Sequence, residues 1–259
     1  MDVIWNLTRA CPWDCAICCV SAFHVCNTTE QLVYSEAKER GEELTLAEKL
    51  TVLKTLTDRN FDIDFSGGDS LYYDEDFRVV EQATRWLPSI KISVSITGSK
   101  ITEAKLELLK KVGVVEFTLD NLPETENPWR PRGYSRASMV AMKKCVAAGI
   151  KVRAITVLYP VTMTKKNLES IYYWLCENGI PEWELLRFYP VGRGTKLAEL
   201  SPSNSEYLKV MKFLRGLHGF TRIFLQHSLK ILEGTIKCPA VVESIGILPD
   251  GTVIACAWA

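Results

Sequence analysis

Five of the chain's nine cysteines lie within one short stretch, TRACPWDCAICCVSAFHVC, which spans residues 8–26. A secreted disulfide framework usually has an even number of cysteines spread through a small chain, and this odd, clustered set does not fit that pattern. In a reducing compartment, a tight cysteine cluster more often binds a metal or takes part in catalysis. The stretch therefore indicates a metal or catalytic site.

The tightest spacing in this stretch is Cys11-x3-Cys15-x2-Cys18. Three thiolates on one loop can each take one corner of a cubane [4Fe–4S] cluster, which leaves one iron open for a ligand that is not protein. The alternative is a structural zinc site with Cys26 or His24 as the fourth ligand. Zinc loops usually pair two separated knuckles, and no second knuckle follows here, so the spacing favours iron–sulfur.

The segments that must position this loop alternate between predicted strands and predicted helices. Six strand–helix units follow from the pattern, with strands at 3–8, 61–65, 90–97, 114–120, 150–159 and 183–189 and helices at 45–60, 74–87, 102–112, 135–148, 165–178 and 205–217. The first of these helices opens with a capping box, Thr45 and Glu48. The alternation predicts an α/β fold of parallel strands, either a flat doubly wound sheet or a curved, partly closed barrel. Ligands bind at the carboxyl ends of the strands in both architectures, and the cysteine loop follows the first strand.

The pattern changes near residue 220. RIFLQH (222–227) and ESIGILPDGTVIAC (243–256) have the composition of β-structure. The second segment predicts a hairpin that turns at Pro249–Asp250–Gly251. We therefore expect a short C-terminal β-hairpin extension after the α/β core.

The overall composition excludes several classes of partner. Lysine plus arginine equals aspartate plus glutamate at 31 each, so the chain offers no general attraction for nucleic acid or an anionic membrane surface. The N-terminus does not resemble a signal peptide, and no run approaches the roughly 18 apolar residues needed to span a bilayer. We expect a cytoplasmic protein without a nucleic-acid or membrane partner.

The cysteine spacing after the first strand of a six-unit domain resembles the radical S-adenosylmethionine (SAM) superfamily. The resemblance implies a partial (β/α)6 barrel over residues 1–218, with Cys11, Cys15 and Cys18 holding a [4Fe–4S] cluster. It also implies that SAM chelates the open iron through its amino and carboxylate groups. Reductive cleavage of SAM then yields methionine and a 5′-deoxyadenosyl radical, which removes a hydrogen atom from the substrate. Many members carry an aromatic residue just before the third cysteine, where this chain has Ile17.

A second part of the resemblance lies after the second predicted strand, where the chain reads Ser66-Gly67-Gly68-Asp69. Family members carry a Gly-Gly-Glu or similar motif there, and its backbone receives the SAM amino group. Two glycines let the backbone approach a ligand closely. The alternative is an ordinary strand-to-helix turn with the aspartate as a cap, and the position of the motif favours SAM binding.

Further SAM contacts are implied on later strands. The segment 114–138 resembles the fourth strand and following loop of peptide-modifying members, although a capping turn with solvated charges is an equal alternative there. In RFYPVGRGT (187–195), which resembles the sixth-strand region, the glycines are expected to let the backbone contact adenine. The implied SAM-binding residues of these regions, together with two inward-facing positions on the third strand, are Ser95, Thr97, Thr118, Asp120, Arg132 and Arg187.

Cys238 and Cys256 flank Gly251 at a spacing that resembles the opening of the SPASM and Twitch extensions of radical SAM enzymes. The resemblance implies a partial extension over 219–259 and an auxiliary iron–sulfur cluster on these two cysteines. The alternative is a pair of buried strand cysteines. The sequence ends before the further cysteines of such extensions, so either the extension is truncated or vestigial, or the missing ligands come from elsewhere, with Cys19 and Cys26 as candidates.

The substrate implied by the 114–138 region and the tail is a ribosomally made peptide. The alternatives are a radical rearrangement, dehydration or epimerisation of a sugar, nucleoside or amino acid, and a non-catalytic metal-binding protein. An electron donor such as flavodoxin or ferredoxin is implied as a partner. The sequence identifies no catalytic acid or base.

Overall fold

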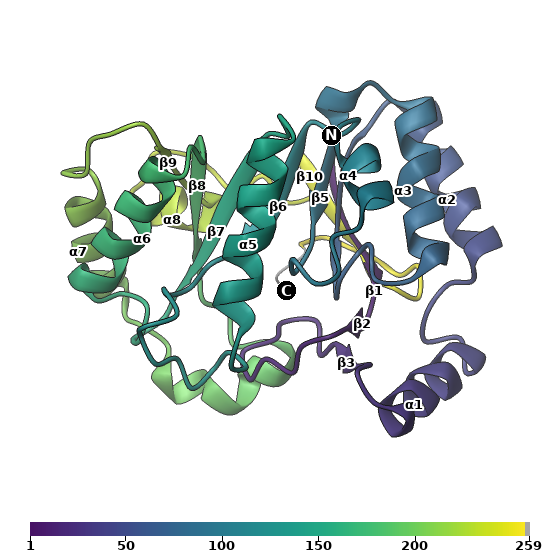
Figure 1. Cartoon of the computed structure of the whole chain (residues 1–259), viewed down its shortest axis with the longest axis horizontal. Coiled ribbons are helices and arrows are strands. Elements are labelled where there is room, and N and C mark those ends of the chain that lie inside the picture. Colours follow the sequence, from purple (N-terminus) through teal and green to yellow (C-terminus); the bar gives the residue numbers. More distant parts are fainter. Residues whose placement is uncertain (257–259) are drawn as a thin grey trace.

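The computed structural model describes residues 1–256, which form one mixed α/β unit around a nine-stranded sheet (Figure 1). The strand order is β11-β10-β1-β4-β5-β6-β7-β8-β9. The strands are β1 (Asp2–Thr8), β4 (Asp62–Gly67), β5 (Ile92–Ser95), β6 (Val114–Thr118), β7 (Val152–Leu158), β8 (Glu182–Arg187), β9 (Arg222–Leu225), β10 (Ser244–Ile247) and β11 (Val253–Ile254). Every neighbouring pair is parallel except β10 with β11.

Helices connect the parallel strands, and α2 to α6 cover one face of the sheet (Figure 1). The α-helices are α1 (Thr28–Glu39), α2 (Leu46–Asp58), α3 (Asp74–Trp86), α4 (Glu103–Leu109), α5 (Tyr134–Ala147), α6 (Lys165–Glu177), α7 (Asn204–Leu214) and α8 (His227–Leu232), with 3-10 helices η1 (Ser89–Lys91) and η2 (Gly192–Leu200). All six predicted strand–helix units are confirmed. The capping box of α2 is present as expected, with the Glu48 backbone donating to Thr45 Oγ1 and the Glu48 carboxylate accepting from the Thr45 backbone.

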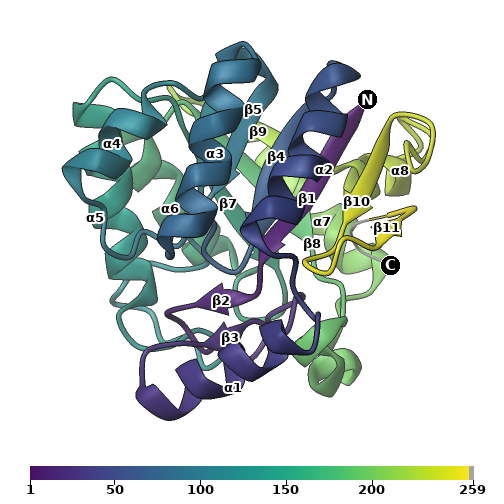
Figure 2. The ribbon, with the colours of Figure 1, turned by 90° about the vertical axis from the view of Figure 1, so that its right-hand side faces the viewer.

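Both edges of the sheet carry strands that the six units do not include. β9 pairs with β8 at one edge. At the other edge β10 pairs with β1, and β11 completes the expected β10–β11 hairpin as the outermost strand (Figure 2). The helix α1 and the small β2–β3 pair, Ala10–Cys11 with Phe23–His24, were also not predicted. The sheet is thus wider than the sequence pattern indicated. The division at residue 218 stays a prediction.

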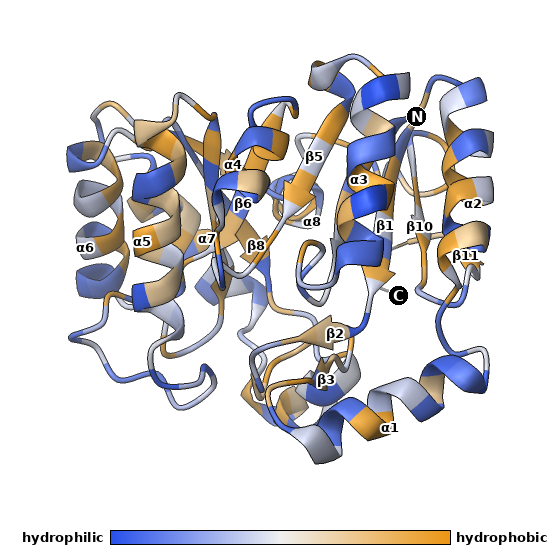
Figure 3. Cartoon of the chain, turned by 45° about the vertical axis from the view of Figure 1, so that its right-hand side comes forward, coloured by the Kyte–Doolittle hydropathy of each residue, from blue (hydrophilic) through white to orange (hydrophobic). Residues whose placement is uncertain are grey.

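The two faces of the sheet differ in polarity. On β4, Ile63 and Phe65 are buried among the apolar side chains that pack between sheet and helices, whereas Asp62, Asp64 and Ser66 point to the other face. The helix ribbons alternate between hydrophilic and hydrophobic residues around their circumference (Figure 3). The alternation along the strands leaves a polar inner wall, which forms the site described next. No helix among residues 1–256 is long and apolar enough to cross a membrane.

Candidate active site at the cysteine loop

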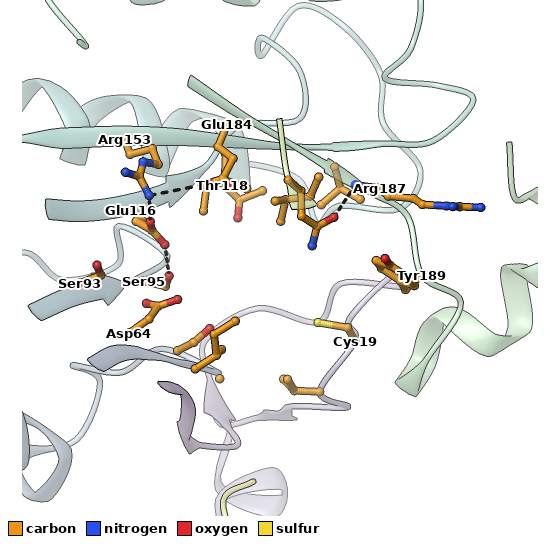
Figure 4. A pocket seen from close by; sticks show the side chains of 18 of the residues that line it. Cys19, Asp64, Ser93, Ser95, Glu116, Thr118, Arg153, Glu184, Arg187 and Tyr189 are labelled. Atoms are coloured by element: carbon orange, nitrogen blue, oxygen red, sulfur yellow. Dashed lines mark hydrogen bonds and ion pairs between the residues drawn. The ribbon is translucent and has the colours of Figure 1, made fainter. Parts of the chain in front are cut away.

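A cavity of about 610 Å³ lies against the inner face of the sheet, with the cysteine loop on one side (Figure 4). Most of the residues singled out from the sequence line it: Cys11, Cys15, Cys18, Ser66, Gly67, Gly68, Ser95, Thr97, Thr118, Arg187, Cys238 and Cys256. Three do not, namely Asp69, Asp120 and Arg132. The loops that follow several strands therefore meet at one site, as expected for the carboxyl edge of a parallel sheet.

The cysteine loop leaves β1 and is held by the short β2–β3 pairing. Cys11 and Cys15 are 6% and 5% exposed, and Cys18 is half-buried, and all three are free thiols. Burial raises the pKa of Cys11 and of Cys15, and the neighbouring Arg130 guanidinium opposes this rise for Cys15. The loop thus gathers three thiols at the cavity wall, with a cation beside one of them.

The two glycines of the β4 turn pack directly on the start of the cysteine loop. A Cβ on Gly68 would lie 2.1 Å from the Ala10 carbonyl oxygen, and a Cβ on Gly67, whose φ is +115°, would lie 2.4 Å from the Thr8 carbonyl oxygen. The Gly68 amide donates to Thr8 O at 2.7 Å, and the Asp69 amide donates to Ala10 O at 2.8 Å. Glycine is therefore required at both positions for the turn and the loop to meet.

Asp69 acts behind the cavity wall rather than in it. Its carboxylate is buried and accepts a hydrogen bond of 2.6 Å from Thr97 Oγ1, which does line the cavity. Burial raises the pKa of Asp69, and the Thr97 hydrogen bond opposes that rise. Asp69 thus positions Thr97, and its expected contact with SAM stays a prediction.

Asp120 and Arg132 also lie off the cavity wall, and their expected contacts with SAM stay predictions. Arg132 is exposed, and Arg130 lines the cavity instead, with its Nε donating to Asp120 Oδ2 at 2.6 Å. Asp120 is fully buried and also accepts from Tyr159 Oη at 3.2 Å, so the alternative of solvated charges is wrong for it. Two arginines flank Pro131, and the sequence alone does not distinguish them.

Arg193 is the residue that sequence reasoning missed. Its Nε donates to Cys15 O at 2.9 Å, its Nη1 to Ala22 O at 2.6 Å, and its backbone amide to Cys18 O at 2.9 Å. A Cβ on the adjacent Gly192 would lie 2.4 Å from Cys19 O. The glycine of this segment that was expected near adenine thus contacts the cysteine loop. The available signal was an arginine enclosed by two glycines.

Comparison with known proteins shows that residues 5–175 match the sequence profile of the Radical SAM superfamily. The chain belongs to this superfamily. Members of this superfamily use a [4Fe–4S] cluster and SAM, and the mostly parallel α/β sheet agrees with the expected partial barrel.

Three similar proteins illustrate the range of this radical SAM group. The chain is 24% identical over 245 residues to the pre-heme d1 synthase of Dinoroseobacter shibae, covering 92% of this chain and 56% of that protein. It is 25% identical over 226 residues to the Fe-coproporphyrin III synthase of Methanosarcina barkeri, covering 83% and 52%. The structure of Streptococcus suis SuiB bound to precursor peptide SuiA superposes with a TM-score of 0.76 at 12% identity, covering 98% and 59%. The chain thus spans a little over half the length of each.

Proposed function

We propose that Cys11, Cys15 and Cys18 hold the [4Fe–4S] cluster and that the Gly67–Gly68 turn binds SAM beside it. The observation that carries this proposal is the direct packing of that turn on the cysteine loop at one end of the cavity. Three cavity-lining thiols suit a cluster that keeps one iron open, and the glycine turn offers unobstructed backbone next to them.

The spread of the ligand atoms favours the cluster over mononuclear zinc. In the part of the chain that the structure describes, no three cysteine or histidine ligand atoms lie within 4.8 Å of one another. Zn–S bonds of about 2.3 Å would bring the sulfurs of a zinc tetrahedron within roughly 4 Å of each other. The thiols around a cubane are farther apart, since each binds a different iron.

When bound, the cluster and SAM supply reductive cleavage to methionine and a 5′-deoxyadenosyl radical that removes a substrate hydrogen atom. The chain's own residues hold and enclose these groups. Arg193 fixes the carbonyls of the cysteine loop, Asp69 fixes Thr97, and Asp120 fixes Arg130 at the cavity wall. Each of these contacts limits movement of a wall that keeps water away from a reactive centre.

We further propose a ribosomally made peptide as the substrate, with flavodoxin or ferredoxin as the electron donor. The likeness in fold to SuiB, which binds precursor peptide SuiA, supports a cavity that admits a peptide. A tetrapyrrole is the second candidate, because both curated relatives are named for heme-type products. The auxiliary cluster on Cys238 and Cys256 and the cytoplasmic location stay predictions.

Formation of 5′-deoxyadenosine tests the cluster assignment. The chain is reconstituted anaerobically with iron and sulfide, reduced and given SAM, and Cys18→Ala is compared with Cys26→Ala. We expect Cys18→Ala to lose the cluster absorbance and the product, because two thiolates cannot hold the cubane with one iron free. Cys26 is exposed and does not line the cavity, so Cys26→Ala keeps both. An intact cluster in Cys18→Ala, or zinc that is lost from Cys26→Ala, would overturn the assignment.

A further inference from the structure

A band of charged and hydroxyl side chains crosses the middle of the cavity wall, one from each of five adjacent parallel strands (Figure 4). In order across β4 to β8 they are Asp64, Ser95, Glu116, Arg153 and Glu184. The strand register places Ser95 opposite Glu116 and Glu116 opposite Arg153. Central parallel strands are usually apolar on both faces, so five polar side chains on the cavity face of these strands require an explanation.

The one arginine of the band makes its closest contacts with two of the nearby carboxylates. Arg153 Nη1 lies 2.9 Å from Glu116 Oε1, and its Nη2 lies 2.8 Å from Glu182 Oε2. Glu116 also accepts a hydrogen bond of 2.8 Å from Ser95 Oγ. Lys151 adds a second cation to Glu182 at 2.5 Å. Glu116 and Glu182 are therefore satisfied within the protein.

The other two carboxylates of the band, Asp64 and Glu184, are paired less well within the protein. The Asp64 Oδ1 atom is buried and has no hydrogen-bond partner among residues 1–256. Glu184 reaches Arg153 only at 3.5 Å, and the other cation that faces it is Lys230 of α8. Burial and the nearby Glu116 charge raise the pKa of both groups, that of Glu184 to about 7. Both carboxyl groups line the cavity, and a cation placed there would restore the interactions that burial removes.

We propose that this carboxylate pair, Asp64 and Glu184, binds a cationic group of the substrate, a primary ammonium or a guanidinium. Such groups carry three to five N–H donors and form charge-assisted hydrogen bonds with carboxylates. The inference rests on the proposed function. It narrows the proposed substrate to a peptide with a basic side chain that this site binds.

The placement along β4 agrees with this role. Asp64 precedes Gly67 by three residues, which corresponds to about 10 Å of strand. A substrate anchored at Asp64 by its cation would extend toward the cysteine loop and present a carbon several bonds away from that cation. A carboxylated tetrapyrrole would instead set its acidic groups against Asp64 and Glu184.

Binding of matched probes to the reconstituted chain with SAM, measured by calorimetry, tests the inference. The probes are acetyl-Gly-Lys-Gly-amide, its norleucine analogue, free butylamine and coproporphyrin III. We expect the lysine peptide to bind at least tenfold more tightly than the norleucine peptide. Butylamine binding without the peptide would assign the site to a small amine. Equal binding of the two peptides, or preferred binding of the porphyrin, would overturn the inference.

Two variants and one control test whether Asp64 and Glu184 cause the preference for the lysine peptide. Asp64→Asn and Glu184→Gln should each reduce the preference for lysine over norleucine about tenfold. Asp62→Asn is the matched control, since Asp62 lies two residues away on the same face of β4 and pairs with Lys91 at 2.7 Å. Thermal unfolding of each variant separates loss of binding from loss of folding, and an unchanged preference in both folded variants contradicts the inference. If SAM cleavage fails while the lysine preference persists, only the proposed function is wrong.

Discussion

Two groups of buried charge lie on opposite faces of the same sheet and differ in how fully their carboxylates are paired. On the helix side, Lys49 of α2 lies 2.9 Å from Glu43 and 2.6 Å from Asp76, and Tyr34 and Thr8 also donate to Glu43. On the cavity side, Arg153 lies closer to Glu116 and Glu182 than to Glu184, which it reaches at 3.5 Å, and Asp64 has a buried oxygen without a hydrogen-bond partner among residues 1–256. Each group leaves one buried carboxylate oxygen without a hydrogen-bond partner, Asp76 Oδ2 in the first and Asp64 Oδ1 in the second. Lys49 nevertheless pairs with both carboxylates of the first group, whereas no ion pair reaches Asp64 among residues 1–256. The comparison distinguishes charged groups that stabilise the fold from carboxylates that are available to bind a ligand.

The largest expected effect comes from removing the cation of the paired group. Lys49→Met should lower the free energy of unfolding by about 3–5 kcal/mol, because it leaves the carboxylates of Glu43 and Asp76 buried and uncompensated. Urea denaturation measures the change. Lys54→Met on the same helix is the control, since Lys54 pairs with Asp58 at the exposed surface and its loss should cost less than about 1 kcal/mol. Equal effects in the two variants would remove the distinction between the groups.

Arg193 is a half-buried cation that donates to backbone carbonyls of the cysteine loop and also pairs with Asp14 at 3.2 Å. Arg193→Gln should destabilise the chain by roughly 2 kcal/mol, because the bonds to Cys15 O and Ala22 O are lost. Reconstituted iron content should fall as the cysteine loop loosens. Lys196→Gln, in the same 3-10 helix but exposed, is expected to retain both stability and iron. Full iron content in a destabilised Arg193→Gln would restrict this arginine to a folding role.

Local patterns predicted those parts of the molecule that depend on nearby residues. The capping box of α2 and the cysteine spacing involve residues a few positions apart, so they could be identified from the sequence. The place of β10 beside β1 depends on a pairing between residues more than 200 positions apart, which no local pattern encodes. For the same reason Arg193 was missed, since its partners lie near the other end of the chain.

The cavity charges illustrate a second limit. Alternation along β4 shows that Asp62 and Asp64 share a face, but it does not show that Lys91 pairs with the first and that the second has an oxygen without a partner. Arg130 and Arg132 present the same difficulty, because only the packing of the loop decides which arginine reaches Asp120. The sequence shows which of these residues are charged, but it does not show which of them pair with one another.

The smallest effect concerns the stability of the unpaired group itself. Burial and the Glu116 charge raise the pKa of Glu184 from 4.5 to about 7 in the folded chain, so the folded protein keeps a proton that the unfolded chain has released between those values. The charged groups that face it are Asp64, Glu116, Glu182, Arg153 and Lys230. Stability is therefore lost as the pH rises from about 4.5 to 7.

Glu184→Gln removes this loss, and it should raise the free energy of unfolding at pH 7.5 by roughly 1–2 kcal/mol, with the gain vanishing near pH 5. Urea denaturation at both pH values measures the difference. Lys49→Met should remain destabilising at both, because its carboxylates lose their cation whatever the charge of Glu184. A Glu184→Gln variant that is less stable than the natural chain at pH 7.5 would mean that this carboxylate is already well paired, and the contrast between the two groups would no longer hold.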